Sequence, residues 1–366
     1  MKSIFLTLLV ATFTLASCQS NKKPDGGFSL KGKINGADGK TYVLAKVDNR
    51  KLAGIDTATV ESGVVEFSGK LDYPQQLYIV ELGQQRPVMM FFGENGDMTF
   101  EGNVDSLAVV EVEGSEANKV FNEYNESMKK YQEQNQQLMQ KYQKAQASHD
   151  QKAIEEVYKE YDDMMARKNE DAKRIITANP KSPVALYLVQ SDFMMNGYDE
   201  LNEVFSVLDT SLNVIPAYKE IKDYLDIMAN VQEGKVAPDF TVPTIDGKEV
   251  TLSSLKGKYV LLDFWASWCK PCIGEIPFMQ KAYKNYKPKG FEIFSVSVDR
   301  DEAAWKKAVK DHQMTWLQGH DTQDISHSKY GVMSIPTTLL LDKDGVIIAK
   351  NLRGEALEAK LKELMK

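Results

Sequence analysis

YVLLDFWASWCKPC, residues 259–272, decides the fold of the last third of the chain. Its first seven residues are almost all apolar, as in a central strand that is covered on both faces. Two cysteines follow at the point where this strand must turn into a helix. Helices and strands then alternate, and a hairpin at DKDG precedes the last strand and helix. This pattern predicts an α/β sheet with an antiparallel edge. We expect helices from the cysteines to residue 286, at 302–310 and from 355, and strands at 291–298, 337–342 and 346–350.

The position of the two cysteines favours redox chemistry. A cysteine at a helix N-terminus feels the positive end of the helix dipole and free backbone N–H groups, and both stabilise a thiolate over a thiol. Cys269 is therefore expected to be the exposed nucleophile, and Cys272, one turn into the helix, the resolving thiol. Lys270 adds a positive charge, and Pro271 stiffens a first turn that needs no N–H partner.

Two other uses of these cysteines compete with the redox role. A structural zinc site needs four ligands. The chain has no second cysteine pair, and its four histidines are scattered, at His149, His312, His320 and His327. We therefore expect no metal site and interpret the histidines as surface or loop residues. Burial of both cysteines for packing is the other use, but the Lys-Pro pair between them disfavours it.

Residues 236–366 resemble the thioredoxin-fold module of the TlpA-like thiol-disulfide oxidoreductases, within the superfamily that includes alkyl hydroperoxide reductases. The resemblance rests on Ala237-Pro238-Asp239-Phe240, Trp268-Cys269-Lys270-Pro271-Cys272, Pro277 where the family's active-site helix kinks, and Ile335-Pro336-Thr337. It implies that Pro336 is cis and lies beside the cysteines, where its backbone pairs with a substrate strand. It also implies a redox centre made of the protein's own dithiol, with no other cofactor, and protein thiols or disulfides as substrates. The expected substrate-binding residues are Trp268, Lys270, Pro271, Ile335, Pro336 and Thr337.

Two carboxylates near the cysteines are candidates for proton transfer. Asp263 lies inside the apolar strand, where the resemblance places the buried acid of thioredoxin, and an unpaired acid there is costly without a purpose. Glu275 matches a glutamate found near the pair in TlpA-like reductases. A buried carboxylate has a raised pKa and can take the proton that the resolving thiol must lose. The alternative for Glu275 is a surface charge that favours the helix dipole.

The tryptophans beside the cysteines have two interpretations. Trp265 and Trp268 are expected to cover the pair and to form part of the docking surface. For Trp265, a packing role is an equal alternative.

Two other classes of function remain open. A peroxidase is disfavoured because Leu262 and Ala266 occupy the Pro and Thr positions of the peroxiredoxin pattern relative to Cys269. A binding or scaffold protein that acts through residues 28–235 is the second alternative, and the complete set of thioredoxin-like motifs argues against it.

The N-terminus resembles a bacterial lipoprotein signal. An apolar run follows Lys2 and is too short for a stable membrane anchor, as in a signal peptide. Leu15-Ala16-Ser17-Cys18 resembles a lipobox, which implies cleavage after residue 17, lipidation of Cys18 and a tether at 18–27. The alternative is an ordinary signal peptide with an incidental cysteine. Lipidation of Cys18 would leave Cys269 and Cys272, of three cysteines in all, with only each other as partners.

The rest of the chain predicts two further regions. Residues 28–114 hold short β-prone stretches between turn signals, as in a small antiparallel sheet or sandwich. Residues 115–234 hold two long segments with helical spacing, broken near Ser148-His149-Asp150, followed by shorter helices. With a thioredoxin-like domain at 235–366, the fold class is multidomain α+β.

The expected function is that of an envelope enzyme. The net charge of −7 gives no basic surplus for nucleic acid. We expect a lipid-anchored thiol-disulfide oxidoreductase that faces the periplasm and reduces protein disulfides, supplied by a membrane electron-donor protein. The proline in Cys-Lys-Pro-Cys and the nearby acids favour the reducing direction, and a thiol oxidant is the alternative.

Overall fold

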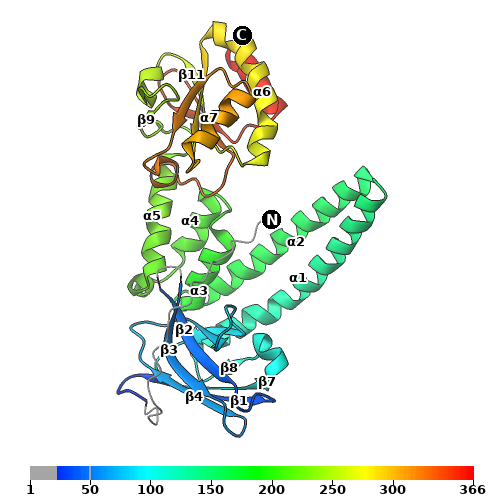
Figure 1. The fold of residues 1–366 in the computed structure, drawn as a ribbon, viewed down its shortest axis with the longest axis vertical. Helices are drawn as coiled ribbons and strands as arrows, with labels where there is room; N and C mark the ends of the chain where they lie inside the picture. The colour runs from blue at the N-terminus through cyan, green and yellow to red at the C-terminus, as the bar shows by residue number, and fades with distance from the viewer. Residues whose placement is uncertain (1–22, 49–50) are drawn as a thin grey trace. The chain divides into compact units, whose positions relative to one another are not determined.

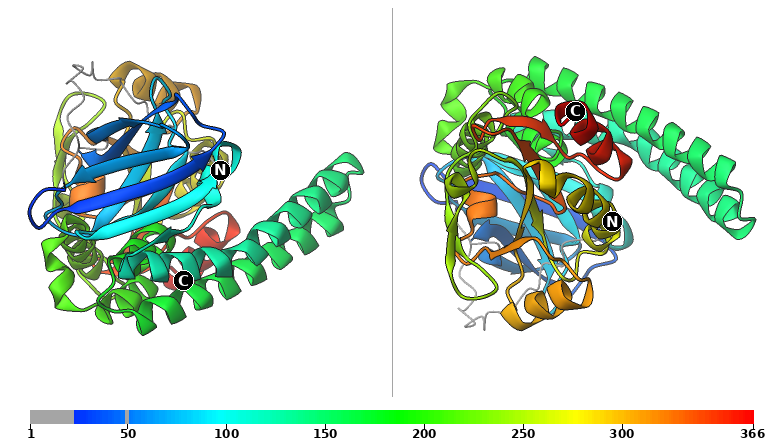
Figure 2. Two further views of the ribbon diagram at one scale, coloured as in Figure 1. Left: turned by 90° about the horizontal axis from the view of Figure 1, so that it is seen from below. Right: turned by 90° about the horizontal axis from the view of Figure 1, so that it is seen from above.

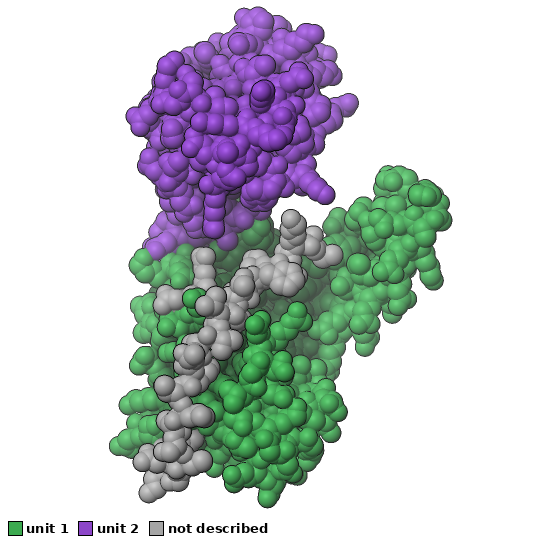
Figure 3. Space-filling model, viewed as in Figure 1, with its two compact units in different colours: residues 1–221 green, residues 222–366 purple. Residues whose placement is uncertain are grey.

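The computed structural model describes residues 23–48 and 51–366, and Figures 1 and 2 show its elements. The chain forms two compact units, residues 1–221 and 222–366, which Figure 3 colours separately. The predicted signal peptide and the lipidation site Cys18 lie outside the described residues. Within the described ranges, no helix has both the length and the apolar character needed to cross a membrane.

The first unit begins with a β-sandwich, as the sequence predicts. One sheet has the order β4-β1-β7-β8 and the other β3-β2-β5-β6. The strands are β1 (Phe28–Asn35), β2 (Thr41–Asp48), β3 (Lys51–Thr59), β4 (Val64–Gly69), β5 (Gln75–Glu81), β6 (Met89–Gly93), β7 (Asp97–Asn103) and β8 (Val112–Glu113), with the 3₁₀ helix η1 (Val104–Val109) before β8. Side chains from both sheets, such as Phe28, Leu44, Phe91 and Phe100, form one buried core.

One pair of sandwich strands departs from the antiparallel prediction. β1 and β7 run parallel. A parallel pair needs a long crossover connection. Here the connection from β1 to β7 runs through β2 and β3 of the second sheet, β4 of the first, and β5 and β6 of the second, before the chain returns beside β1 in the same direction.

Two long helices form an antiparallel hairpin, which confirms the helical prediction. They are α1 (Glu116–Ala147) and α2 (Gln151–Ala178). Ser115 and Asp150 cap their N-termini through hydrogen bonds from the backbone N–H groups of Asn118 and Ala153. The following helices are α3 (Pro183–Leu188), the π-helix η2 (Val189–Phe193), α4 (Tyr198–Ser206), η3 (Thr210–Val214) and α5 (Pro216–Asn230), and the division between the units falls within α5.

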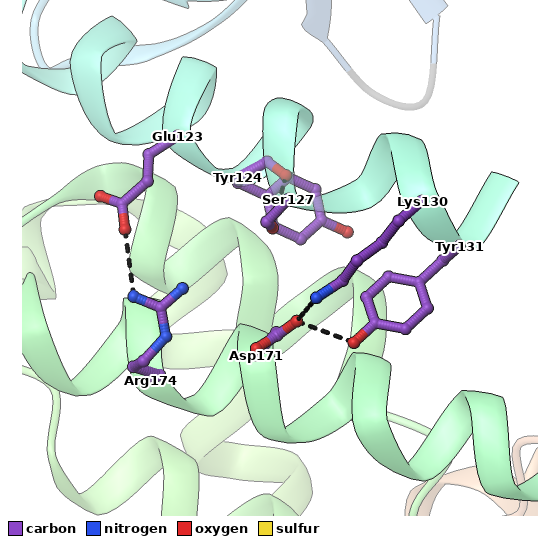
Figure 4. Close-up of polar contacts among 7 residues, drawn as sticks. All are labelled: Glu123, Tyr124, Ser127, Lys130, Tyr131, Asp171 and Arg174. Carbon is purple, nitrogen blue, oxygen red and sulfur yellow. Dashed lines mark hydrogen bonds and ion pairs between the residues drawn. The ribbon is translucent and has the colours of Figure 1, made fainter. Parts of the chain in front are cut away.

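Charged side chains link the two long helices where Figure 4 shows them. The carboxylate of Asp171 on α2 accepts hydrogen bonds from Lys130 Nζ and Tyr131 Oη of α1, each at 2.7 Å. Arg174 pairs with Glu123 at 3.4 Å. Because Lys130, Glu123 and Arg174 are largely exposed, apolar contacts between α1 and α2 contribute more to the hairpin than the ion pairs do.

The second unit is the predicted α/β sheet, in the order β13-β12-β11-β14-β15. β13, β12 and β11 are parallel, and β14 and β15 are antiparallel additions. Its elements are β9 (Thr241–Pro243), β10 (Glu249–Thr251), η4 (Leu252–Leu255), β11 (Tyr259–Trp265), α6 (Lys270–Tyr286), η5 (Lys287–Lys289), β12 (Phe291–Ser297), α7 (Glu302–Asp311), β13 (Leu317–His320), α8 (Ile325–Ser328), β14 (Thr337–Leu341), β15 (Ile347–Lys350) and α9 (Glu355–Leu364).

One strand of this unit was missed from the sequence, and one histidine was misplaced. Strand β13 was not predicted, because Leu-Gln-Gly-His is short and mostly lacks β-prone residues. The assignment of His320 to the surface or a loop, made because the four histidines are scattered in the sequence, was wrong. This histidine is 8% exposed, its Nε2 lies 2.7 Å from the backbone oxygen of Asp299, and its ring stacks on Trp305.

Candidate active site

Cys269 and Cys272 form a disulfide at the start of α6, with their Cα atoms 5.3 Å apart. Cys269 is the N-cap residue of the helix, and its Sγ accepts a hydrogen bond from the backbone N–H of Cys272 at 3.2 Å. A serine or aspartate oxygen usually fills this position. Because the same N–H and the helix dipole would stabilise negative charge on Cys269 after reduction, the geometry suits a nucleophilic thiolate.

Neither cysteine is exposed in this disulfide form. Each is 4% exposed, so the expectation that Cys269 is exposed was wrong for the oxidised pair. Lys270 and Pro271, at the first two positions of α6, are exposed beside it. Pro277 lies inside the same helix.

The neighbouring tryptophans have separate roles. Trp265 is 1% exposed and belongs to the apolar cluster around the cysteines, which favours the packing interpretation. Trp268 is 63% exposed, immediately before Cys269. Of the two, only Trp268 is therefore placed on a surface that a substrate could contact.

Asp263 is a buried acid on the face of the sheet that the cysteines cover. It is 4% exposed. Alternation along β11 puts its side chain on the same face as Leu261 and Trp265, which pack in the cluster that contains both cysteines. Burial raises the pKa of Asp263 to about 6, while Ser295 and Arg353 lower the pKa and Glu275 raises it. An acid with such a pKa can both accept and release a proton near neutral pH.

A chain of hydrogen bonds supports the ionised form of Asp263. The Ser295 hydroxyl on β12 donates to Asp263 Oδ2 at 2.8 Å and accepts from the indole N–H of Trp316 at 2.9 Å. An indole N–H can only donate. The single hydroxyl proton of Ser295 therefore points to the carboxylate, and this direction favours the anion.

Replacing Ser295 by alanine should raise the pKa of Asp263. A hydrogen bond to a charged group contributes about 1.5–3 kcal/mol, so we expect an increase of about one pH unit or more. The measurement is the NMR titration of the Asp263 carboxyl carbon in the oxidised protein. Ser297→Ala is the matched control, because this buried serine of the same strand donates to Asp299 instead. Equal titration curves for both variants would contradict the role of Ser295.

Glu275 is less exposed and more constrained than a surface charge. It lies in α6, and its Oε2 accepts a hydrogen bond from the backbone N–H of Gly354 at 2.8 Å. Its charge also raises the pKa of Asp263. The two predicted acids therefore interact electrostatically, and Glu275 is fixed to the turn before α9.

The Ile335-Pro336-Thr337 segment leads into β14 beside the end of β11. The Ile335–Pro336 peptide bond is cis, as expected. Ile335 packs against the cluster that includes both cysteines. Thr337 pairs with Phe264 across the sheet, and its hydroxyl donates to the Ser334 carbonyl at 2.7 Å. This arrangement brings the cis-proline loop and the strand before the cysteines together.

Sequence reasoning missed the residue that holds the loop before the cysteines. Asp299 is buried, and its carboxylate accepts hydrogen bonds from the Ser267 N–H at 2.8 Å and the Ser267 hydroxyl at 2.7 Å. Its position at the C-terminal end of β12, next to the loop after β11, was the only signal in the sequence. In residues 23–48 and 51–366, no group of three or more histidine, cysteine or acidic side chains is placed to hold a metal.

Comparisons with known proteins cover both units. Residues 234–350 match the AhpC/TSA family, and residues 28–121 match a domain of unknown function (DUF4369). The thiol-disulfide oxidoreductase ResA of Bacillus cereus is 38% identical over 39% of this chain and 82% of its own length. ResA of Bacillus subtilis is 35% identical over 37% of this chain and 75% of its own length.

A solved structure gives a similar match. It is the thioredoxin domain of a thiol-disulfide oxidoreductase from Bacteroides vulgatus, 37% identical, with 37% of this chain and 99% of that chain covered and a TM-score of 0.36.

Proposed function

This chain belongs to the family of thiol-disulfide oxidoreductases that includes ResA, and we propose that it reduces protein disulfides with the Cys269–Cys272 pair. The observation that supports this most is the disulfide at the N-terminus of α6, whose first sulfur accepts a helix N–H. The buried acid on the same face of the sheet and the cis-proline segment add support.

The reaction begins with attack on the substrate. The thiolate of Cys269 attacks one sulfur of a substrate disulfide, so a mixed disulfide forms and the other substrate sulfur leaves and takes a proton. The backbone beside Pro336 offers a place for the substrate strand to pair. Trp268, Lys270 and Pro271 are exposed around the attacking sulfur and would contact the substrate.

The second step releases the product. The Cys272 thiol gives its proton to Asp263, whose ionisation Glu275 and Arg353 adjust. The new thiolate attacks Cys269, so the Cys269–Cys272 disulfide forms and the reduced substrate leaves. Two electrons pass from the dithiol to the substrate disulfide. No metal or bound cofactor takes part, and a membrane electron-donor protein would return the pair to the dithiol.

The proposed site of action is the periplasm, with the chain anchored through lipid at Cys18. The support is the sequence of residues 1–18, an apolar run that ends in Leu-Ala-Ser-Cys. Labelling cells with a radioactive fatty acid tests the anchor. Incorporation into wild type that disappears in Cys18→Ala is expected, and equal labelling of the two would contradict it.

The reduction potential of the cysteine pair tests the direction of the reaction. We expect a value of about −250 mV or lower, as in thioredoxin-like reductants. The measurement is equilibration with a reference dithiol, followed by quantification of free thiols. A value near −120 mV, typical of a strong oxidant, would reverse the proposed direction. Failure of the two thiols to form a disulfide would exclude the redox function.

A further inference from the structure

The segment between the last strand and the last helix, Asn351–Gly354, is hydrogen-bonded to β14, the strand that follows the cis-proline. The N–H of Asn351 donates to the carbonyl of Thr338 at 2.8 Å, and its side-chain oxygen accepts from the N–H of Thr338 at 3.2 Å. Thr338 is the register partner of Asp263. The segment is therefore attached to the strand that neighbours the buried acid.

Arg353 and Gly354, in the same segment, make further hydrogen bonds, one to the cis-proline loop and one to the helix α6 that carries the cysteines. The Arg353 guanidinium donates to the carbonyl of Pro336, and the Gly354 N–H donates to the Glu275 carboxylate at 2.8 Å. Gly354 has a φ of +53° and a ψ of −127°, a backbone conformation that residues with a Cβ rarely adopt. The sequence Arg-Gly thus places a side-chain donor on the cis-proline loop and a backbone donor on α6.

Arg353 also acts on the buried acid through its charge. The groups that act electrostatically on Asp263 are Ser295 from β12, Glu275 from α6 and Arg353 from the segment before α9. The positive charge of Arg353 lowers the pKa of Asp263, against the effects of burial and of Glu275. Because Arg353 is partly buried, solvent screens this charge less than it screens an exposed lysine.

We propose that Arg353 is a positioning residue that joins the substrate-binding loop to the proton-accepting acid. Its planar guanidinium holds the Pro336 carbonyl in a fixed direction, and its charge keeps the nearby carboxylate ionised for the release step. Lysine cannot replace both functions, because it is a point charge without the fixed fork of donors. The inference rests on the proposed disulfide reduction and assigns it a residue outside the recognised motifs.

The test is the reduction of insulin disulfides by the full-length chain, with dithiothreitol as terminal reductant. It compares wild type, Arg353→Met, Arg353→Lys and the control Lys362→Met, which removes an exposed charge of α9. We expect Arg353→Met to lower kcat/KM about tenfold at about pH 5, below the pKa of about 6 of Asp263, because there a rise of one pH unit in that pKa cuts the ionised fraction of the acid tenfold; at neutral pH the same rise costs only about twofold. The acidic limb of its pH profile should move to higher pH, because loss of the positive charge raises the pKa of Asp263.

The lysine variant separates the two functions of Arg353. It should restore the wild-type acidic limb, since the charge is present. Its KM should stay above that of wild type, as we also expect for Arg353→Met, since the guanidinium that holds the Pro336 carbonyl is absent. This variant also keeps the proposal testable if Arg353→Met does not fold.

Two outcomes count against the proposal in different ways. If wild type is active and both arginine variants have the KM and the pH profile of Lys362→Met, the role of Arg353 is overturned while disulfide reduction stands. If wild type reduces no insulin disulfide, the proposed function and the role of Arg353 fail together.

Discussion

Cys272→Ser should stop turnover and leave Cys269 covalently bound to its substrate. Cys269 can still attack a substrate disulfide, but no second thiol is present to resolve the mixed disulfide. Because the two cysteines act as one unit, we expect activity to fall on the order of a thousandfold or more. Non-reducing electrophoresis and mass spectrometry of the trapped species, followed by insulin turnover, make the measurement.

Cys269→Ser is the matched control for this experiment. It should lose activity to the same degree and trap nothing, because the nucleophile itself is absent. The reverse pattern, with substrate trapped only when Cys272 is the remaining cysteine, would exchange the two roles. Full turnover in either variant would contradict the proposed mechanism.

Asp263→Asn should stabilise the oxidised protein at neutral pH and remove a pH dependence of its stability. The pKa of Asp263 rises from 3.8 to about 6 on folding, so the folded state keeps a proton that the unfolded state loses. The contribution of Asp263 to the free energy of unfolding is greatest below pH 3.8, falls as the pH rises through about 6, and is then constant. The difference of about two pH units corresponds to roughly 3 kcal/mol.

Urea unfolding of the oxidised protein between these two pH values makes this measurement, because the disulfide prevents the cysteines from titrating. Asp344→Asn, an exposed aspartate in the turn between β14 and β15, is the control and should keep the wild-type slope. The difference in the free energy of unfolding between wild type and Asp263→Asn isolates this carboxyl group, and a difference that does not change with pH would mean that Asp263 is not responsible. The same variant should resolve mixed disulfides more slowly, since an amide cannot accept the proton of Cys272.

Local patterns predict most of the C-terminal sheet and the redox pair. The apolar run before the cysteines and the Cys-Lys-Pro-Cys spacing are short-range signals, so they are visible in the sequence. Strand β13 is held by its pairing with β12 rather than by β-prone residues, and the chain around Leu317 carries no comparable signal. His320, the last residue of this strand, is likewise buried by its pairing with β12 and its stacking on Trp305.

The support for the site is long-range and was less predictable. Ser295 reaches Asp263, and Trp316 reaches Ser295, only because β11, β12 and the start of β13 lie side by side. A clue was present, since Ser295 interrupts the apolar strand FEIFSVSV at an inward position. The sequence around Arg353 offers no comparable clue. The glycine that follows it could equally mark the start of a helix or a backbone contact to α6.

The N-cap of α6 links the redox state of the cysteine pair to the hydrogen-exchange rate of one backbone amide, that of Cys272. In the disulfide, Cys269 Sγ is a neutral acceptor for the Cys272 N–H. Reduction to the thiolate would place negative charge on that acceptor, and hydrogen bonds to charged groups are stronger than neutral ones. The exchange rate of this one amide hydrogen therefore reports the redox state of the enzyme from inside its own active site, with no added label.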